Sequence, residues 1–341
     1  MLCNPARLTY TVGMRALVID QFRPFKNHSV SDAPSPDLKP GHARVKMRAG
    51  GVNFPDILMI EGNYQIRPPF PFTAGAEGAG EVIELGEGVK RLKVGDRVAV
   101  MPGVGTFAEE AVIMEPLCVK IPDSMSFEEA AGFVMVYGTS YHALKDRAEL
   151  KPGDRVLVLG AAGGVGLAAV ELAKAMGAEV TAAASTDEKL ATCKAHGADF
   201  LVNYTEGDDL KAMFKGAGGK GGFDVIYDPV GDRFAEPAFR SIAWQGRYLV
   251  VGFAAGDIPK LPLNLTLLKG ADVRGVFYGA WTQRDPKGAY GNIQELFALF
   301  EDGKLKPRVD ASYPLEDFAK AMDDLSNRRV QGKVVLTMND A

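Results

Sequence analysis

Residues 156–166, which read VLVLGAAGGVG, decide the fold of this chain. The first four form a continuous apolar run, typical of a buried parallel strand. Glycines follow at positions 160, 163, 164 and 166, and an apolar, alanine-rich helix is predicted directly after them. Glycines let the backbone approach a pyrophosphate closely, and the helix N-terminus offers N–H groups and a partial positive charge. The stretch predicts a dinucleotide-binding turn; a tight turn without a ligand is the alternative.

The end of the next strand bears on which dinucleotide binds. NAD-binding versions carry an acidic residue there for the ribose 2′-hydroxyl, but this chain reads Ala184-Ser185-Thr186 and has no carboxylate before Asp187. Lys189 follows Ser185 by four residues, so one helical turn can bring its ammonium group to a 2′-phosphate. A hydroxyl and an ammonium group suit a phosphate dianion, which a carboxylate would repel. The pattern favours NADPH over NADH; alternatively, Ser185 only caps the helix and Lys189 is solvated.

The character of the 341-residue chain changes twice, and its length favours two domains. Residues 14–136 contain short β-type runs separated by Gly and Pro turns, which predicts a β-rich domain. From 137 onward, predicted strands alternate with helical segments, which predicts a parallel sheet with helices on both faces. These strands are expected at 155–159, 179–184, 200–203, 224–228 and 247–253. After 275, helices at 292–301 and 315–325 precede a last strand at 333–337.

Composition excludes several classes of function. Acidic residues number 43 and basic residues 39, a net charge of −4 that attracts neither nucleic acid nor an anionic membrane. The three cysteines, at 3, 118 and 193, form no disulfide framework, which favours a reducing cytosol. Residues 1–13 lack the apolar run of a signal peptide, and the most apolar stretch, 156–173, contains four glycines. We therefore expect a cytoplasmic protein without a membrane span.

Six motifs, taken in order, resemble those of one family. They are Gly51-Val-Asn53-Phe-Pro-Asp56, Gly75-Ala-Glu77-Gly-Ala-Gly80, Val94-Gly-Asp-Arg-Val98, the glycine turn at 160–166, Asp224-Val-Ile-Tyr-Asp-Pro-Val-Gly231 and Gly332-Lys-Val-Val-Leu336. Over residues 14–338 the chain resembles the zinc-independent medium-chain dehydrogenases/reductases, specifically the zeta-crystallin-like quinone oxidoreductases. The resemblance implies an α/β fold: a doubly wound Rossmann domain, residues 137–274, inserted in a GroES-like, β-rich catalytic domain formed by residues 1–136 and 275–341. It also implies a substrate cleft between the two domains.

The resemblance further implies a set of NADPH-binding residues. Asn53 and Thr139 match positions near the nicotinamide, and Gly163, Gly164 and Val165 match positions at the pyrophosphate. Ser185, Lys189 and Tyr204 look like contacts of the 2′-phosphate and the adenosine ribose. The remaining matches are Phe253 and Phe277 beside the nicotinamide pocket and Arg328 at the cofactor phosphates, with Arg329 as the competing choice. Packing or solvation is the alternative for each loop residue.

The chain departs from the zinc alcohol dehydrogenases at their metal ligands. Those enzymes carry a catalytic Cys where this chain reads Gly51-Val-Asn53, and a His where it has Ala76 before Glu77. Residues 86–117, where the structural-zinc loop would lie, contain no cysteine. A tetrahedral zinc site needs thiolate or imidazole ligands. We therefore expect no metal, and reduction of activated, conjugated acceptors as the chemistry.

Tyr64, in Glu61-Gly-Asn-Tyr64, is the first candidate for assisting hydride transfer. In the enoyl-thioester reductases that this segment resembles, a tyrosine here donates a hydrogen bond or proton to the substrate. A phenol is a reasonable donor to a developing enolate, although a tyrosine that only shapes the cleft is an equal alternative. Asn53 can orient the acceptor oxygen or the cofactor ribose, or else hold its own turn together.

The sequence also contains an aromatic segment and four histidines. The aromatic segment 277–281 is interpreted as a loop that either lines the acceptor site or serves packing. The four histidines, at 28, 42, 142 and 196, show no ligand-like spacing and receive no role.

The leading hypothesis is an NADPH-dependent reductase of quinones or α,β-unsaturated carbonyl compounds. An enoyl-thioester reductase acting on acyl-CoA or acyl carrier protein is the first alternative, with Arg67 and Arg284 as weak hints of a CoA site. An NADPH-binding structural or RNA-binding protein is the second. The expected partners are a small-molecule substrate and, from the resemblance, a second copy of the chain joined through an edge of the Rossmann sheet.

Overall fold

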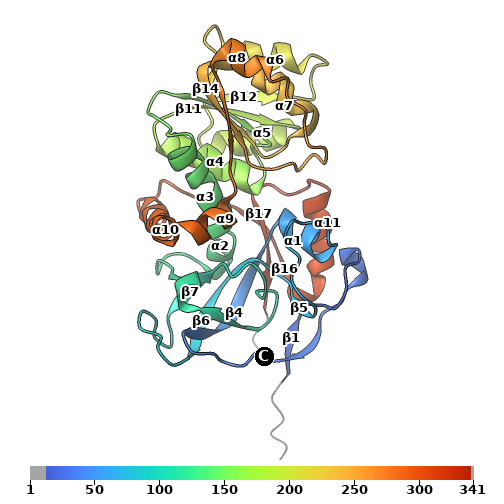
Figure 1. Ribbon diagram of the computed structural model, residues 1–341, viewed down its shortest axis with the longest axis vertical. Helices are drawn as coiled ribbons and strands as arrows, with labels where there is room; N and C mark the ends of the chain where they lie inside the picture. The colour runs from blue at the N-terminus through green and yellow to red at the C-terminus, as the bar shows by residue number, and fades with distance from the viewer. Residues whose placement is uncertain (1–12, 339–341) are drawn as a thin grey trace, which may run out of the picture. The chain divides into compact units, whose positions relative to one another are not determined.

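The computed structural model describes residues 13–338, which form two compact units (Figure 1). The first unit spans Met1–Ile121, Ser312–Asp323 and Val335–Ala341; the second spans Pro122–Ala311 and Asp324–Val334. The domain division expected from the sequence, at 136/137 and 274/275, differs from these limits over residues 122–136 and 275–311. It stays a prediction about which residues fold together in solution. The interpretation of residues 1–12 as lacking a signal peptide lies outside the described residues, as does Cys3.

A six-stranded parallel sheet forms the centre of the second unit, in the order β12-β11-β10-β13-β14-β15. The strands are β10 (Arg155–Leu159), β11 (Glu179–Ala184), β12 (Phe200–Asn203), β13 (Phe223–Asp228), β14 (Ile242–Val250) and β15 (Asp272–Gly275). Along the chain, the strands are added outward from β10 through β11 to β12. The chain then returns to β13, which lies beside β10, and adds β14 and β15 in the opposite direction. This is the doubly wound order, with its switch point between β10 and β13.

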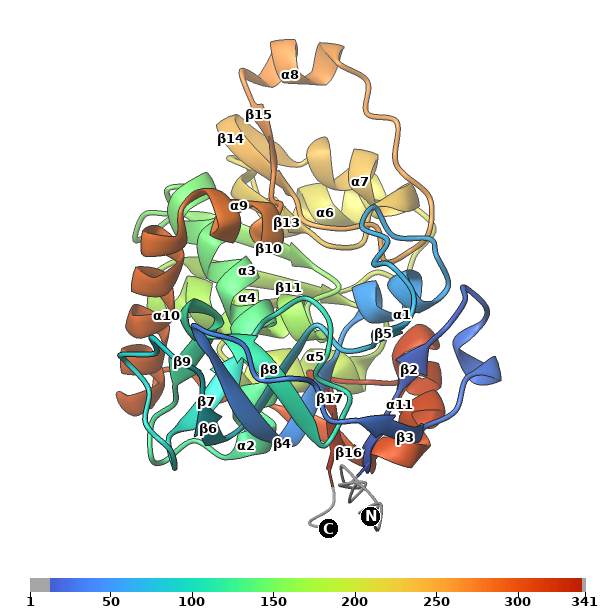
Figure 2. The same cartoon turned by 60° about the horizontal axis from the view of Figure 1, so that its bottom comes forward.

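Helices follow the strands of this sheet (Figure 2). They are α4 (Gly164–Ala175), α5 (Asp187–Ala195), α6 (Leu210–Gly218), α7 (Asp232–Phe239) and α8 (Asn264–Lys269). Crossovers between parallel strands are right-handed, so the two directions of travel put α4 and α5 on one face and α6, α7 and α8 on the other. Phe214, Phe239 and Tyr248 are fully buried in the core on the second face.

The rest of the second unit is helical and precedes or follows the sheet. Its elements are α2 (Phe127–Ala131), α3 (Val134–Tyr141), a π-helical turn (His142–Arg147), α9 (Tyr278–Arg284) and α10 (Pro286–Glu301). Helix α3 packs on α4. The segment after residue 323 returns to the glycine turn, because the Gly332 N–H donates to the Ala162 carbonyl oxygen at 2.8 Å.

The first unit is built on an antiparallel sheet. Its strands run in the order β16-β17-β4-β6-β7-β9, and β8 also pairs with β4. They are β4 (His42–Val52), β6 (Glu77–Leu85), β7 (Arg97–Val100), β8 (Glu110–Met114), β9 (Cys118–Lys120), β16 (Val309–Pro314) and β17 (Lys333–Thr337). Two small pairs, β1 (Gly13–Ala16) with β3 (Ser31–Pro34) and β2 (Val18–Ile19) with β5 (Phe72–Thr73), and the helices α1 (Phe54–Ile60) and α11 (Phe318–Ser326) complete it. The last strand therefore pairs in the first unit, as the sequence allowed.

Sequence patterns located the strands better than the helices. Strands β10, β11, β12 and β17 have the predicted bounds, and α4 follows the glycine turn as predicted. Helix α10 begins six residues before the predicted 292, because Asp285 Oδ1 accepts the Gly288 N–H at 2.9 Å and Pro286 occupies the first turn. The interpretation of 277–281 as a loop is wrong: α9 begins at Tyr278.

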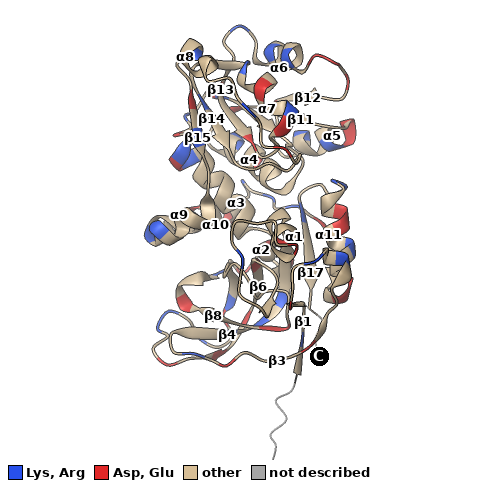
Figure 3. Ribbon diagram, turned by 45° about the vertical axis from the view of Figure 1, so that its right-hand side comes forward, with Lys and Arg blue, Asp and Glu red and all other residues tan. Residues whose placement is uncertain are grey.

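No helix within residues 13–338 is long and apolar enough to cross a membrane. Lys and Arg are interspersed with Asp and Glu on the ribbons of both units, and α5 and α11 each carry both signs (Figure 3).

The glycine turn offers a matched pair of stability tests. A Cβ atom at Gly166 would lie 2.3 Å from the Gly160 carbonyl oxygen, whereas at Gly163 the nearest atom, the same oxygen, would be 3.5 Å away. We expect Gly166→Ala to lower the free energy of unfolding by about 3 kcal/mol and Gly163→Ala by less than about 1 kcal/mol. Urea denaturation followed by far-UV circular dichroism measures both. Equal losses in the two variants would contradict this account of the turn.

Candidate functional site

The N-terminus of α4 lies directly after β10 and is open. Gly163 is the N-cap residue, with φ −78° and ψ 170°, and no side chain within residues 13–338 caps the helix. Gly163, Gly164 and Val165 are each only half-buried. The first-turn N–H groups of a helix need acceptors from outside the helix, and they attract anions. These three predicted residues therefore form a helix N-terminus that an anion can approach.

Asp228 shapes the other side of the switch point, at the end of β13. Its buried carboxylate accepts the N–H groups of Val230 and Gly231 at 2.7 and 2.8 Å and the hydroxyl of Tyr248. Burial raises the pKa of Asp228, and these three hydrogen bonds oppose the rise. The turn that Asp228 holds brings Gly231 so close to Phe253 that a Cβ atom at 231 would lie 2.9 Å from the phenyl ring. Phe253 is thus packed on this turn and half-buried.

Four predicted residues meet where β11 and β12 end. Lys189 Nζ lies 3.5 Å from Ser185 Oγ, and the Tyr204 hydroxyl is hydrogen-bonded to Ser185. Lys189 Nζ also donates to the Arg328 carbonyl oxygen at 2.7 Å. Arg328 itself is exposed, has a left-handed backbone (φ 57°) and donates from Nη2 to the Ala254 carbonyl oxygen at 3.3 Å. We call Ser185, Lys189, Tyr204 and Arg328 the β11–β12 cluster.

The alternative reading of Ser185 as a helix cap is not what the structure shows. Thr186 caps α5, because its Oγ1 accepts the Lys189 N–H at 3.3 Å. The Ser185 hydroxyl is therefore used by side chains of the cluster. Arg329, the competing choice to Arg328, pairs instead with Asp324 at 2.9 Å.

Sequence reasoning missed one residue near this cluster. Burial raises the pKa of Tyr204, and the charges of Arg328 and Arg233 oppose the rise, so Arg233 also lies near this hydroxyl. Arg233 belongs to α7, an element that contains none of the residues of the β11–β12 cluster. Its only signal in the sequence is that it directly follows the Asp-Pro-Val-Gly-Asp turn at 228–232.

Helix α3 connects Thr139 to the glycine turn. Thr139 is half-buried, and its neighbour Ser140 donates to the Val165 carbonyl oxygen at 2.8 Å and contacts the Tyr227 hydroxyl at 2.8 Å. Thr139 is thereby held close to the first turn of α4. Phe277, the residue before α9, is 53% exposed.

The aromatic residues that follow Phe277 serve packing. Trp281 stacks on His142, with ring centroids 4.0 Å apart, and Tyr278 is buried against Gly138. The spacing of Tyr278 and Trp281 by three places them on one face of α9. The His142 ring nitrogen Nδ1 lies 2.8 Å from Asp146. This segment is therefore a helix whose Tyr278 and Trp281 pack, and its role as a wall of the acceptor site stays a prediction.

In the first unit, Asn53 belongs to a buried polar cluster. Its Nδ2 donates to the Gly51 carbonyl oxygen at 3.1 Å and to Glu77 Oε1 at 2.9 Å. Asp56 accepts the N–H groups of Asn53 and Ala76, at 2.8 and 3.0 Å. Both hydrogens of the Asn53 amide are thus used inside this unit, which favours the interpretation that Asn53 holds its own turn together.

Tyr64 lies near the same cluster and is half-buried. Burial raises its pKa, and the negative charge of Asp56 adds to the rise. The phenol therefore keeps its proton throughout the neutral pH range and can donate it in a hydrogen bond.

Comparison with known proteins identifies the family. The GroES-like domain of alcohol dehydrogenases matches residues 39–123, and the zinc-binding dehydrogenase family matches residues 164–295. Quinone oxidoreductase-like protein 2 of Bos taurus is 37% identical over 95% of this chain and 92% of its own length. The chain belongs to the quinone oxidoreductase-like family. It is an oxidoreductase of the medium-chain dehydrogenase/reductase type, and the predicted family and fold class are confirmed.

Two solved structures agree over nearly the whole chain. Quinone oxidoreductase from Pseudomonas syringae is 32% identical with a TM-score of 0.87, over 95% of this chain and 99% of that one. Quinone oxidoreductase from Escherichia coli, complexed with NADPH, is 28% identical with a TM-score of 0.88 and has the same coverage.

One of the matching families is named for zinc. The resemblance implies that the segment Gly51–Asp56 and Ala76 stand where zinc alcohol dehydrogenases carry ligands, and the segment and Ala76 contain neither Cys nor His. Within residues 13–338, no three His, Cys, Asp or Glu side chains gather as a metal site requires. His196 instead pairs with an acidic side chain: its Nδ1 lies 2.6 Å from the buried Glu171, which also accepts the Tyr137 hydroxyl at 2.6 Å.

The raised pKa of Asp228 predicts a pH-dependent stability. Because folding favours the protonated carboxyl, its contribution to stability is full below the unfolded pKa and is lost as the pH rises through the folded pKa. We expect wild type to lose stability relative to Asp228→Asn as the pH rises above about 4, the ordinary range of an aspartate pKa. Urea midpoints across rising pH measure it, with the exposed Asp302→Asn as the control. A difference that does not change with pH would contradict the expectation.

Proposed function

We propose that this oxidoreductase uses NADPH to reduce quinones or α,β-unsaturated carbonyl compounds without zinc. The observation that carries the proposal is the β11–β12 cluster, in which Lys189 and Arg328 flank two hydroxyl groups. This arrangement suits the 2′-phosphate of NADPH, a dianion. The NADPH complex of the E. coli relative supports the same cofactor. When bound, NADPH supplies a hydride to the acceptor.

The residues of the second unit would bind and orient this cofactor. Gly163, Gly164 and Val165 would lie against the pyrophosphate at the N-terminus of α4, where the Gly163 N–H itself donates to the Gly160 carbonyl oxygen at 3.0 Å, and the β11–β12 cluster would bind the 2′-phosphate. Thr139, Phe253 and Phe277 are proposed contacts on the nicotinamide side. Asn53, in the first unit, stays a separate prediction for the same part of the cofactor.

Tyr64 is the proposed catalytic donor. Hydride transfer leaves negative charge on the acceptor oxygen, and a hydrogen bond from a neutral phenol stabilises that charge. The raised pKa keeps Tyr64 protonated for this role. Asn53 is proposed as a second catalytic residue that orients the site through its contacts with Glu77 and Gly51.

An enoyl-thioester reductase is the second candidate, and Tyr64 is again the observation that favours it. The arginines proposed as hints of a CoA site support it less. Arg67 Nη2 donates to the Gly62 carbonyl oxygen at 2.7 Å, and Arg284 Nη1 to the Ala280 carbonyl oxygen at 3.0 Å. Both guanidinium groups are thus already held by their own backbone segments.

The decisive experiment follows NADPH and NADH oxidation with ortho- and para-quinones, an enone and crotonyl-CoA. We expect turnover of quinones or the enone with NADPH in preference to NADH, and a loss of about 10²-fold in kcat for Tyr64→Phe. A preference for crotonyl-CoA would support the second candidate, an enoyl-thioester reductase, in place of the first. Tight NADPH binding without turnover of any acceptor would leave a binding or structural protein.

We also propose that two copies of the chain associate through β15. This strand is an edge of the sheet, paired only with β14 among the described residues. Beside it stand exposed apolar side chains, with Leu263 and Leu267 each 80% exposed and Trp244 68% exposed. An unpaired edge strand next to exposed leucines is a surface that a second copy can cover.

A charge placed on this surface tests the association. We expect the wild type to sediment as a dimer and Leu267→Glu to sediment as a monomer with unchanged circular dichroism, because burying an unpaired carboxylate is costly. Val94→Glu, at a position 61% exposed in the first unit, is the matched control. A monomeric wild type would refute the proposal.

A further inference from the structure

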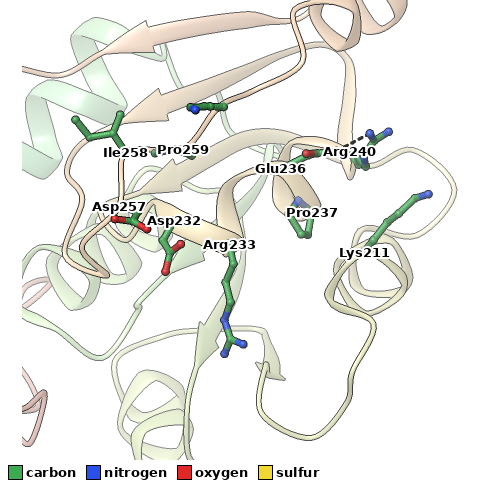
Figure 4. A pocket seen from close by; sticks show the side chains of 10 residues that line it. Lys211, Asp232, Arg233, Glu236, Pro237, Arg240, Asp257, Ile258 and Pro259 are labelled. Atoms are coloured by element: carbon green, nitrogen blue, oxygen red, sulfur yellow. Dashed lines mark hydrogen bonds and ion pairs between the residues drawn. The ribbon is translucent and has the colours of Figure 1, made fainter.

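Arg233 lies at the start of α7, immediately after the turn that Asp228 holds. Its side chain is exposed and lines an open hollow of about 800 Å³ with Lys211, Asp257 and Lys260. Within residues 13–338, its guanidinium makes no hydrogen bond and no salt bridge. Arg240, the C-cap residue of α7 about two turns after Arg233, is instead paired with Glu236 at 2.5 Å (Figure 4).

The Arg233 guanidinium packs on an aromatic ring. Its central carbon lies 5.0 Å from the centroid of the Phe234 ring, a cation–π contact. The Phe234 ring lies 4.8 Å from the ring of Tyr204, centroid to centroid. Phe234 is buried, so it is a fixed support. Arg233 is thereby connected through two rings to the β11–β12 cluster.

The charge of Arg233, like its packing on Phe234, connects it to Tyr204. The positive charges of Arg328 and Arg233 both act on the Tyr204 hydroxyl. Arg328 approaches from the segment after α11, and Arg233 comes from α7. The hydroxyl pair of Ser185 and Tyr204 thus has cations from three separate elements around it, counting Lys189 on α5.

We propose that Arg233 is a further specificity residue, whose guanidinium recognises the ribose 2′-phosphate of the cofactor together with Lys189 and Arg328. This inference rests on the proposed use of NADPH. Lys189, Arg328 and Arg233 form no salt bridge within residues 13–338, and a dianion bound among them would offset their mutual repulsion. A guanidinium can also bind a phosphate through two parallel hydrogen bonds, and its planar face can stay on the Phe234 ring while it does so.

The test compares two cofactor fragments that differ only in the phosphate concerned. Binding of 2′,5′-ADP and 5′-AMP is measured by calorimetry for wild type, Arg233→Ala, Arg233→Lys and Arg240→Ala. We expect Arg233→Ala to reduce the preference for 2′,5′-ADP by about tenfold at low ionic strength and by less at high ionic strength, because the contact is exposed. Arg233→Lys should keep most of the preference, and Arg240→Ala all of it.

The outcomes separate this inference from the proposed function. A wild type with no preference for 2′,5′-ADP would overturn the proposed use of NADPH and this inference with it. A preference that survives in Arg233→Ala would overturn only the role of Arg233. Equal weakening of both fragments in Arg233→Ala would also overturn it, because the side chain would then serve the adenine or the fold.

Discussion

The close contact between the first turn of α4 and the end of β10 is the constraint on which the rest of the second unit depends. Gly166 packs on the Gly160 carbonyl oxygen so tightly that no side chain fits. This contact fixes where the helix N-terminus lies relative to the sheet. Ser140 on α3 then binds Val165, and Gly332 binds Ala162, so two segments distant in sequence are positioned by the same turn.

The open helix N-terminus and the cations beyond β11 have a common physical basis. Both are groups that lack an anionic partner inside the described part of the chain: the first turn of α4 and the side chains of Lys189 and Arg328. A fold tolerates such groups at its surface, where water solvates them, and a dinucleotide with a pyrophosphate and a 2′-phosphate can satisfy both at once. The family relationship and the geometry thus agree on a phosphate-bearing dinucleotide.

Asn53 and the segment after Phe277 show why roles were harder to predict than elements. The amide of Asn53 was a reasonable donor on its residue type, but Glu77, which engages it, lies 24 positions away. Trp281 meets His142 across 139 positions. Buried networks such as Glu171 with Tyr137 and His196 are built from equally distant partners. A local pattern contains the residue types but not their partners.

The sequence by itself determined the parallel sheet, the glycine turn and the lack of a carboxylate at the end of β11, because strand patterns, glycine spacing and side-chain chemistry are local properties. It also placed Ser185 and Lys189 one helical turn apart, and the structure keeps them 3.5 Å apart. Only the tertiary structure decided that Thr186 caps α5, that Asn53 is held by Glu77 and that the charges of Arg328 and Arg233 act on Tyr204. Those arrangements depend on which segments the sheet order brings together, and that order follows from the packing of the whole unit.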